Sequence, residues 1–334
     1  MMSDLAKAER QPSAMGLPAT DSIPRRPGSI RRTSHIDMHM HGHELVLDGA
    51  ARDLVTSTSG TRVVDIATVR AHVDDTGRLA TLDIGGAVGP TDALIGRLVG
   101  VGFRDAVHAA FPDDTAAGTG LALLLDDLPV AALISGYARL YRGDIPADDA
   151  AQRMKADICS GWRSEGSMMV SVRAGQGVPV TVGPPAPSID VERSADPLGW
   201  HDIGPLPVGA MRRRRLVDIH CADDAWSVAA MFRDTHVDTD GAETVLHEYV
   251  LTGSVDPETG VFTSCAAVPR VLPWVECPVA AASAGRLVGQ PADSVRDFVR
   301  ADLRGTSTCT HLNDLLRSLG DVTVLAASLA RALA

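Results

Sequence analysis

The sequence predicts an α+β protein made of two tandem homologous units, each an antiparallel sheet followed by three helices, packed together as a pseudo-dimer. Three observations predict this fold: an internal repeat, strand-like alternation early in each unit, and helical periodicity later in each unit. We expect residues 1–29 to form a disordered arm, 30–172 copy one, 173–210 a Gly/Pro linker and 211–334 copy two.

The internal repeat is carried by pairs of identical residues that lie 181 positions apart. These pairs are Asp37 and Asp218, His39 and His220, Arg52 and Arg233, Asp53 and Asp234, and Gly60 and Gly241. The segment Gly96–Gly100 also recurs unchanged as Gly285–Gly289. Two copies related in this way resemble a fused homodimer with a pseudo-twofold axis.

The first elements of copy one are predicted to be strands. Residues 34–40 alternate apolar and polar side chains, as a half-buried strand does. The pattern continues through 44–55 and 61–73, and a hairpin turn at 74–77 leads into a further strand at 78–84.

The later elements of copy one are predicted to be helices, because the period changes after Pro90. The expected helices are residues 91–99, 103–111 and 121–141, the last broken or kinked at Pro129. An extra helix is expected at 147–162.

Copy two repeats this order. Its expected strands are 216–221, 226–234, 244–254 and 261–266, and its expected helices are 278–288, 293–303 and 309–333. Gly320 interrupts the last helix near the place where copy one has Pro129.

Composition narrows the class of protein. A chain of 334 residues suggests two domains, and the 45% hydrophobic content is ordinary for a globular protein. The net charge of −11 argues against nucleic acid or an anionic membrane as a partner, and we interpret Arg212–Arg215 as a solvated strand entry. We find neither a membrane span nor a secretory signal, and the five cysteines lack a disulfide spacing. We therefore expect a cytoplasmic protein that takes a small-molecule ligand, and a homo-oligomer is compatible with the sequence.

A family resemblance appears in residues 305–312, Gly-Thr-Ser-Thr-Cys-Thr-His-Leu. Together with Cys277-Pro278 and Leu287-Val288-Gly289, this motif resembles a bacterial family of unknown function, DUF2889. The resemblance covers most of copy two and implies no activity. Copy one resembles a diverged member, with Ala122–Leu125 where copy two has Cys309–Leu312.

A weaker resemblance is architectural. The order of a small antiparallel sheet, a Cys at a strand end and two further Cys at helix starts is similar to iron–sulfur scaffold proteins of the NifU/SufE type. The residues that would correspond are Cys265, Cys277 and Cys309 with His311.

The candidate catalytic residues are Cys309, His311 and Glu248. Cys309 follows Thr308, which resembles a helix N-cap, and a helix N-terminus favours a thiolate. The alternative is that Cys309 is a core residue, in phase with leucines of the same helix. Glu248 is an acid/base candidate together with His247, and we expect Ile66-Ala67 in their place in copy one.

The candidate substrate-binding residues are Arg233, Asp234 and Cys277. Arg233 is suited to bind a substrate carboxylate and Asp234 to act as acid or base, although a charge pair at a strand end more often fixes a turn.

Two sets of residues are candidate metal ligands. Cys265, Cys277, Cys309 and His311 suit zinc or another soft metal if a sheet edge and two helix starts converge, and three separate structural cysteines are the alternative. The second set, His35, His39, His41 and His43, shares a strand face, for which a solvated edge is the favoured interpretation.

The sequence thus predicts a cytosolic enzyme of small-molecule metabolism, of hydrolase or lyase type, with its site in copy two. The alternatives are a metal or sulfur carrier using Cys265, Cys277, Cys309 and His311, and a non-catalytic ligand-binding module. The sequence requires no cofactor and allows a divalent metal.

Overall fold

The computed structural model describes residues 10–20, 23–86, 89–145, 155–222 and 224–334. Its main feature is a nine-stranded antiparallel sheet with the order β2-β11-β10-β9-β8-β3-β4-β5-β6. The strands are β2 (Met15–Gly16), β3 (Ser29–His41), β4 (Glu44–Ser57), β5 (Gly60–Val73), β6 (Leu79–Asp83), β8 (Met211–Cys221), β9 (Trp226–Val237), β10 (Glu243–Val255) and β11 (Phe262–Leu272). Helices accompany this sheet, so the predicted α+β class is confirmed.

The strands of copy one and copy two join at the middle of this sheet. The first long strand of each copy lies at the join, and β3 pairs with β8 antiparallel. In this register Ser34 faces Arg215, two residues that the 181-residue offset equates. The Ser34–Arg215 pair therefore marks the position of the predicted pseudo-twofold axis. The duplication itself stays a prediction, which superposition of residues 31–142 on 212–334 would test.

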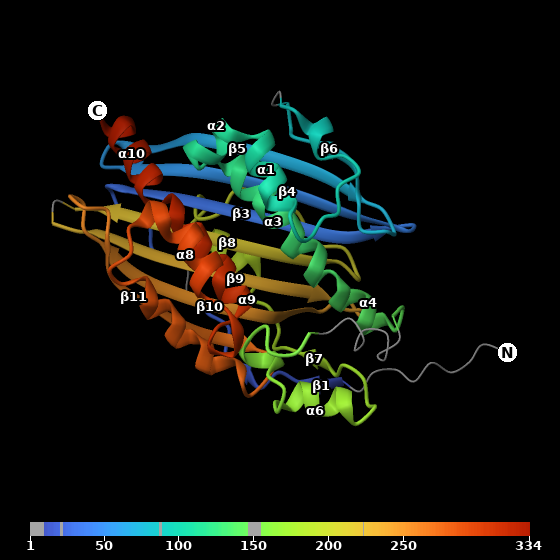
Figure 1. Cartoon of the computed structure of the whole chain (residues 1–334). Helices are drawn as coiled ribbons and strands as arrows, with labels where there is room; N and C mark the ends of the chain where they lie inside the picture. The colour runs from blue at the N-terminus through green and yellow to red at the C-terminus, as the bar shows by residue number, and fades with distance from the viewer. Residues whose placement is uncertain (1–9, 21–22, 87–88, 146–154, 223) are drawn as a thin grey trace.

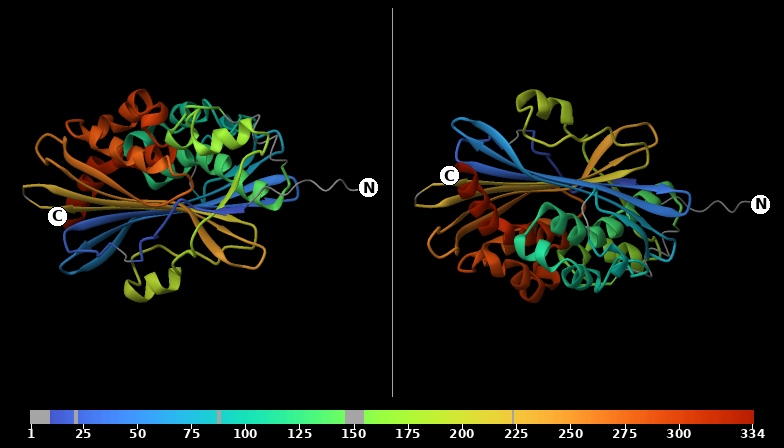
Figure 2. Two further views of the ribbon diagram at one scale, coloured as in Figure 1. Left: turned by 90° about the horizontal axis from the view of Figure 1, so that it is seen from below. Right: turned by 90° about the horizontal axis from the view of Figure 1, so that it is seen from above.

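The helices that follow each set of strands cover one face of the sheet (Figures 1 and 2). In copy one these are α1 (Phe103–Ala110), α2 (Pro112–Ala117), α3 (Gly120–Ile134) and α4 (Gly136–Arg142). In copy two they are the 3-10 helix η3 (Cys277–Leu287), α8 (Val295–Asp302), α9 (Thr310–Ser318) and α10 (Val322–Leu333). Each set packs mainly on its own half of the sheet, and two separate apolar cores form. Helix α10 also crosses the join and contacts β3 and β4 of copy one.

The helix breaks differ between the copies. The predicted break near Gly320 is confirmed, because the 3-10 turn η6 (Leu319–Asp321) separates α9 from α10. The predicted helix at 121–141 is not broken at Pro129, since α3 runs through Pro129 and ends at Ile134. The break lies instead at Ser135, between α3 and α4, and a kink at Pro129 stays a prediction. The first half of the predicted helix at 147–162 (147–154) lies outside the described residues. The second half (155–162) is not α-helical, and Ser160–Trp162 is a 3-10 turn.

The opposite face of the sheet carries the N-terminal segment and much of the linker. Two segments of the predicted disordered arm form strands instead: β1 (Arg10–Pro12) pairs with β7 (Val180–Val182), and β2 pairs with β11. The linker contains the short helix α7 (Ile189–Ala195), which lies on this face in Figure 2. Trp200, His201 and Ile203 of the linker are buried.

The predicted solvated run Arg212–Arg215 is buried instead, and all four arginines are at most 4% exposed. Side chains of a strand alternate between faces, so each arginine meets its own carboxylate. Arg212 pairs with Asp37, Arg213 with Asp234, Arg214 with Glu192 and Arg215 with Asp127. These ion pairs connect the central strand to copy one, to the linker and to copy two.

One apolar segment bears on the expectation that the chain has no membrane span. Gly120–Arg142, which comprises α3 and α4, is long and apolar enough to cross a bilayer by length and composition, although 67% of its apolar window is buried inside the protein. This burial is typical of a core helix.

Candidate functional site

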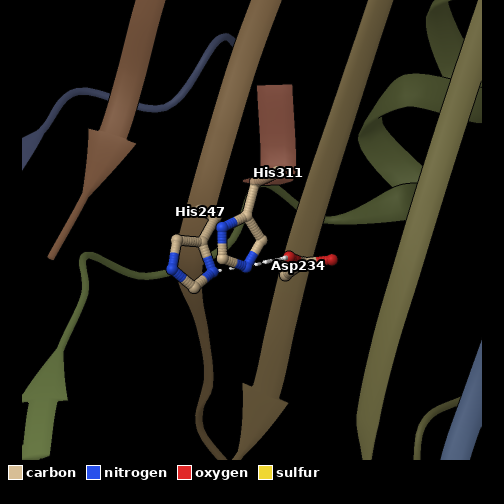
Figure 3. Close-up of side chains that lie close together, drawn as sticks. All are labelled: Asp234, His247 and His311. Carbon is tan, nitrogen blue, oxygen red and sulfur yellow. Dashed lines mark ion pairs between the residues drawn. The ribbon is translucent and has the colours of Figure 1, made fainter. Parts of the chain in front are cut away.

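Three polar side chains from copy two converge on the helical face of the sheet: Asp234 of β9, His247 of β10 and His311 of α9 (Figure 3). His247 lies opposite Asp234 in the strand register, and α9 begins one residue before His311. His247 Nδ1 lies 3.4 Å and His311 Nε2 3.9 Å from Asp234 Oδ2. One donor atom of each side chain lies within 4.8 Å of the other two. We call these three residues the His-His-Asp cluster.

Asp234 is fixed in this cluster by Arg213 on the neighbouring strand β8. The guanidinium donates two hydrogen bonds to the carboxylate, Nε to Oδ1 at 2.7 Å and Nη2 to Oδ2 at 2.8 Å. Burial alone would raise the pKa of Asp234, but the attraction of Arg213 outweighs it and holds that pKa well below its usual range. Asp234 is therefore an oriented carboxylate at neutral pH.

The two imidazoles of the cluster are stacked, with ring centroids 3.7 Å apart and an interplanar angle of 19°. Burial, followed by repulsion from His247, lowers the pKa of His311 well below its usual value. His311 is therefore neutral at neutral pH and keeps one ring nitrogen with a free lone pair.

Two polar groups at the cluster lack a hydrogen bond among the described residues. His247 Nδ1 and the Tyr249 hydroxyl are both buried without a partner, and both side chains project from the same face of β10. The cluster is not sealed, because 19% of the His247 side chain and 20% of the His311 side chain are exposed. Orphaned polar atoms beside partly exposed imidazoles indicate a place that a water, an ion or a ligand can fill.

Cys309 lies next to the cluster, with Sγ 3.9 Å from His311 Nδ1. It is the N-cap residue of α9, but its side chain makes no cap hydrogen bond and the residue is 5% exposed. Burial raises the pKa of the Cys309 thiol to about 11. The expected thiolate is therefore wrong: the desolvation cost exceeds the effect of the helix N-terminus, and Cys309 is a neutral thiol beside His311.

The structure separates Glu248 and Arg233 from Cys309 and His311. Both lie on the opposite face of the sheet, where Arg233 Nε donates to Glu248 Oε2 at 2.7 Å. The backbone of Ala19 contacts both side chains, with its amide on Glu248 and its carbonyl on Arg233. These two predicted site residues thus form an ion pair that holds the N-terminal segment.

The four-residue ligand set predicted from the cysteines is not gathered either. Among the described residues, the His-His-Asp cluster is the group of three or more that brings candidate ligand atoms together. Cys277 is buried, and its Sγ lies close to Gly161. Burial raises the pKa of Cys265 to about 12 and raises that of Cys277 as well, which disfavours the thiolate form that binds metals.

The histidine series of β3 does not form a single edge. His35 Nδ1 lies 2.6 Å from His201 Nε2, and Thr33 Oγ1 lies 2.8 Å from His201 Nδ1. His35 thus packs against the linker, whereas His41 is exposed.

The corresponding place in copy one has a different composition. Asp53 faces Asp65 in the strand register, as Asp234 faces His247, so Asp65 and not Ile66 is the counterpart of His247. A bulge beside each aspartate shifts the register by one residue. Leu121 stands one residue after the start of α3, as His311 does in α9, so Leu121 and not Leu124 is the counterpart of His311. A cavity of about 570 Å³ opens here, and its lining includes Arg32, Asp53, Arg62, Asp65, Thr119 and Arg331.

The sequence predicts Asp234, His311 and Cys309 as site residues and groups His247 with Glu248. Neighbouring residues of a strand point to opposite faces, so His247 and Glu248 cannot share one site. That alternation was the available signal: if Asp234 faces the helices, one of the pair His247 and Glu248 must face them too.

Comparison with known proteins adds a family and nothing on activity. No curated protein and no solved structure matches the chain. The model of a family described as "Protein of unknown function (DUF2889)" matches residues 211–325. Residues 211–325, which include the His-His-Asp cluster, are therefore similar to the DUF2889 family.

Proposed function

We propose that this protein is an enzyme of small-molecule metabolism, of hydrolase or lyase type, and that the His-His-Asp cluster of copy two is its reaction centre. One observation carries the proposal: two stacked imidazoles and an oriented carboxylate converge at a partly exposed position with an unpartnered ring nitrogen. Carboxylates and imidazoles are the groups that activate water or hold the ion that does so, which hydrolases and many lyases require.

The exposure of these groups distinguishes the cluster from the other buried charges of the sheet. Arg31 and Asp218, for example, form a closed ion pair, with the arginine 1% and the aspartate 8% exposed. The His-His-Asp cluster differs because its two imidazoles are partly exposed. A small-molecule ligand and a cytoplasmic location remain part of the proposal, supported by the net charge of −11 and the five free cysteines.

The test is metabolite profiling with protein that carries no histidine tag. Wild type is incubated with a small-molecule cell extract, and mass spectrometry follows which compounds are consumed and formed. We expect turnover of a compound by the wild type and a loss of about 100-fold or more in His247→Phe and His311→Leu, as for removal of a group that contacts the reacting atoms.

His236→Phe is the matched control, because His236 is a buried histidine of β9 that lies outside the cluster and contacts Tyr137 and Tyr141. It should keep the turnover. Equal turnover in His247→Phe and wild type, or no compound consumed by the wild type, would contradict the proposal and favour a non-catalytic ligand-binding module.

A further inference from the structure

We propose that Asp234, His247 and His311 bind one divalent transition-metal ion per chain, with zinc as the best-fitting ion. The binding of the ion stands on the geometry of the cluster alone, and its role in turnover rests on the proposed function. Two imidazoles and one carboxylate are a set of donors that zinc and related ions take in open, catalytic sites.

The distances between donor atoms fit such an ion. In a tetrahedral zinc site with ligand bonds of about 2.0–2.1 Å, neighbouring donor atoms lie about 3.3–3.4 Å apart. Asp234 Oδ2 already lies 3.4 Å from His247 Nδ1 and 3.9 Å from His311 Nε2. A shift on the order of half an ångström brings His311 Nε2 to the same separation. The lone pair of a ring nitrogen lies in the plane of its ring, so the two stacked imidazoles must also turn out of their near-parallel arrangement for both to point at one ion. We expect this side-chain rotation to accompany binding.

The residues around the cluster orient the donors as residues around metal ligands do. Arg213 binds both oxygens of Asp234 but leaves each oxygen a further lone pair for an ion. Cys309 lies against His311 Nδ1, so the contact to the protein uses that nitrogen and Nε2 faces Asp234. Cys309 is thus a positioning residue for His311 and not a ligand.

Charge and hydrogen bonding also leave room for a cation. Arg213 is shared between Asp234 and Asp314, and Asp314 contacts Arg104 at 3.3 Å. The guanidinium beside the cluster is therefore neutralised by carboxylates and does not confront an incoming ion with an unpaired charge. The unpartnered His247 Nδ1 gains a bond when the ion is present.

Three protein ligands leave at least one coordination position open. The exposed fifth of each imidazole places that position toward solvent, where water or substrate can reach it. Zinc lowers the pKa of a bound water to about 7, which supplies a hydroxide for hydrolysis or proton abstraction. Copy one has Asp53, Asp65 and Leu121 in the corresponding positions, so we expect a single site in each chain.

The experiment measures metal binding by the full-length, tag-free protein after removal of metals by a chelator. Isothermal titration with Zn²⁺ gives stoichiometry and affinity, and the absorption spectrum of the Co²⁺ form reports the coordination geometry. Wild type is compared with His247→Phe, with His311→Leu and with His236→Phe as the matched control. A combined His39→Ala, His41→Ala and His43→Ala variant removes the histidines of the β3 end, and circular dichroism checks the fold of each variant.

We expect one Zn²⁺ per chain and a Co²⁺ spectrum without a sulfur charge-transfer band. Binding should weaken about 100-fold or more in His247→Phe and in His311→Leu, and stay unchanged in His236→Phe and in the combined variant. Cys309→Ala should weaken binding about 10-fold, as loss of a contact behind a ligand does.

Absence of stoichiometric binding, unchanged affinity in folded His247→Phe or His311→Leu, or loss of binding in the combined variant would overturn the proposal. The metal site and the enzyme proposal can be refuted independently of each other. Turnover that depends on the two histidines without any bound metal would refute the metal site and leave the enzyme proposal standing. A bound metal without turnover would support the metal site and refute the enzyme.

Discussion

Arg213 stabilises the fold and also orients Asp234 of the His-His-Asp cluster. Its side chain is 2% exposed, and it contacts Asp234 and Asp314 from two different elements. Attraction to these carboxylates outweighs burial and raises the pKa of Arg213 above its usual value, so the guanidinium stays charged. Removal of one partner from such a pair leaves a buried charge without compensation.

Arg213→Met should lower the free energy of unfolding by about 3–5 kcal/mol, because Asp234 loses its two charge-assisted hydrogen bonds in a buried place. Urea unfolding monitored by circular dichroism measures the change. The control is Arg300→Met, which breaks an ion pair with Asp105 in which both side chains are more than half exposed. The control should unfold like wild type, and equal stabilities of the two variants would contradict the prediction.

His35 and His201 make stability depend on pH. Burial lowers the pKa of both imidazoles to about 3, with Arg212 and Arg214 adding repulsion at His35 and His35 itself at His201. An unfolded histidine titrates near 6.5, so between these values the unfolded chain binds protons that the folded chain does not. These two residues therefore destabilise the fold as the pH falls from about 6.5 toward 3.

Replacing both by glutamine should flatten this dependence. Between about pH 6.5 and 4 the wild type should lose a few kcal/mol more unfolding free energy than the His35→Gln, His201→Gln variant. Urea unfolding at a series of pH values measures both slopes. Parallel slopes would mean that this contact does not control the acid stability of the fold.

At the scale of elements, patterns of period two and 3.6 predicted most of the structure. The order of strands before helices in both copies followed from them, as did the break near Gly320. Pro129 misled the prediction because the surrounding α3 residues are almost all buried, and packing on the sheet keeps the helix continuous around one missing amide.

The misread elements have partners far away in the sequence. Arg215 and Asp127 are 88 residues apart and Arg212 and Asp37 are 175, so no local pattern shows that the arginine run is buried. The site was found only in part for the same reason. Asp234 and His311 stood out by residue type, whereas the pairing of His247 with Asp234 depends on a strand register that includes a bulge.

The N-terminal segment is an element whose contribution can be measured. Its Ala19 backbone accepts a hydrogen bond from Arg233 and donates one to Glu248, both 2.6 Å long, on the face of the sheet opposite the helices. Deletion of residues 1–20 removes these bonds and β2. We expect the free energy of unfolding to fall by about 1–3 kcal/mol, because two buried charged groups lose a partner.

Deletion of residues 1–9 is the control, since it retains β1, β2 and Ala19. Thermal and urea unfolding of the two truncated proteins and the full chain give the comparison. If the protein that lacks residues 1–20 has the same free energy of unfolding as the full chain, the segment does not stabilise the fold.

At the scale of the whole molecule, the pairing of β3 with β8 makes one sheet out of two copies. The pairing is reinforced by reciprocal ion pairs: Arg31 binds Asp218, and Arg212 binds Asp37. The 181-residue offset equates Arg31 with Arg212 and Asp37 with Asp218, so the two ion pairs are equivalent by the repeat. A chain containing copy two alone would leave β8 as an unpaired edge, which is a template for another strand.

Residues 209–334 expressed alone should therefore form a homodimer through β8. An antiparallel pair of β8 strands centred on Arg215 places Arg212 of each fragment opposite Asp218 of the other, which gives two ion pairs in place of the two of the intact chain. The same register sets Arg215 against Arg215, where copy one supplies Ser34. Like charges directly opposite destabilise a strand pair, so Arg215→Ser should strengthen the dimer. Asp218→Arg should weaken the dimer, because it places two arginines opposite each other.

Light scattering coupled to size-exclusion chromatography measures the mass of each fragment over a concentration series. A monomeric Arg215→Ser fragment that is folded by circular dichroism would show that the symmetry of this interface is not sufficient to assemble it.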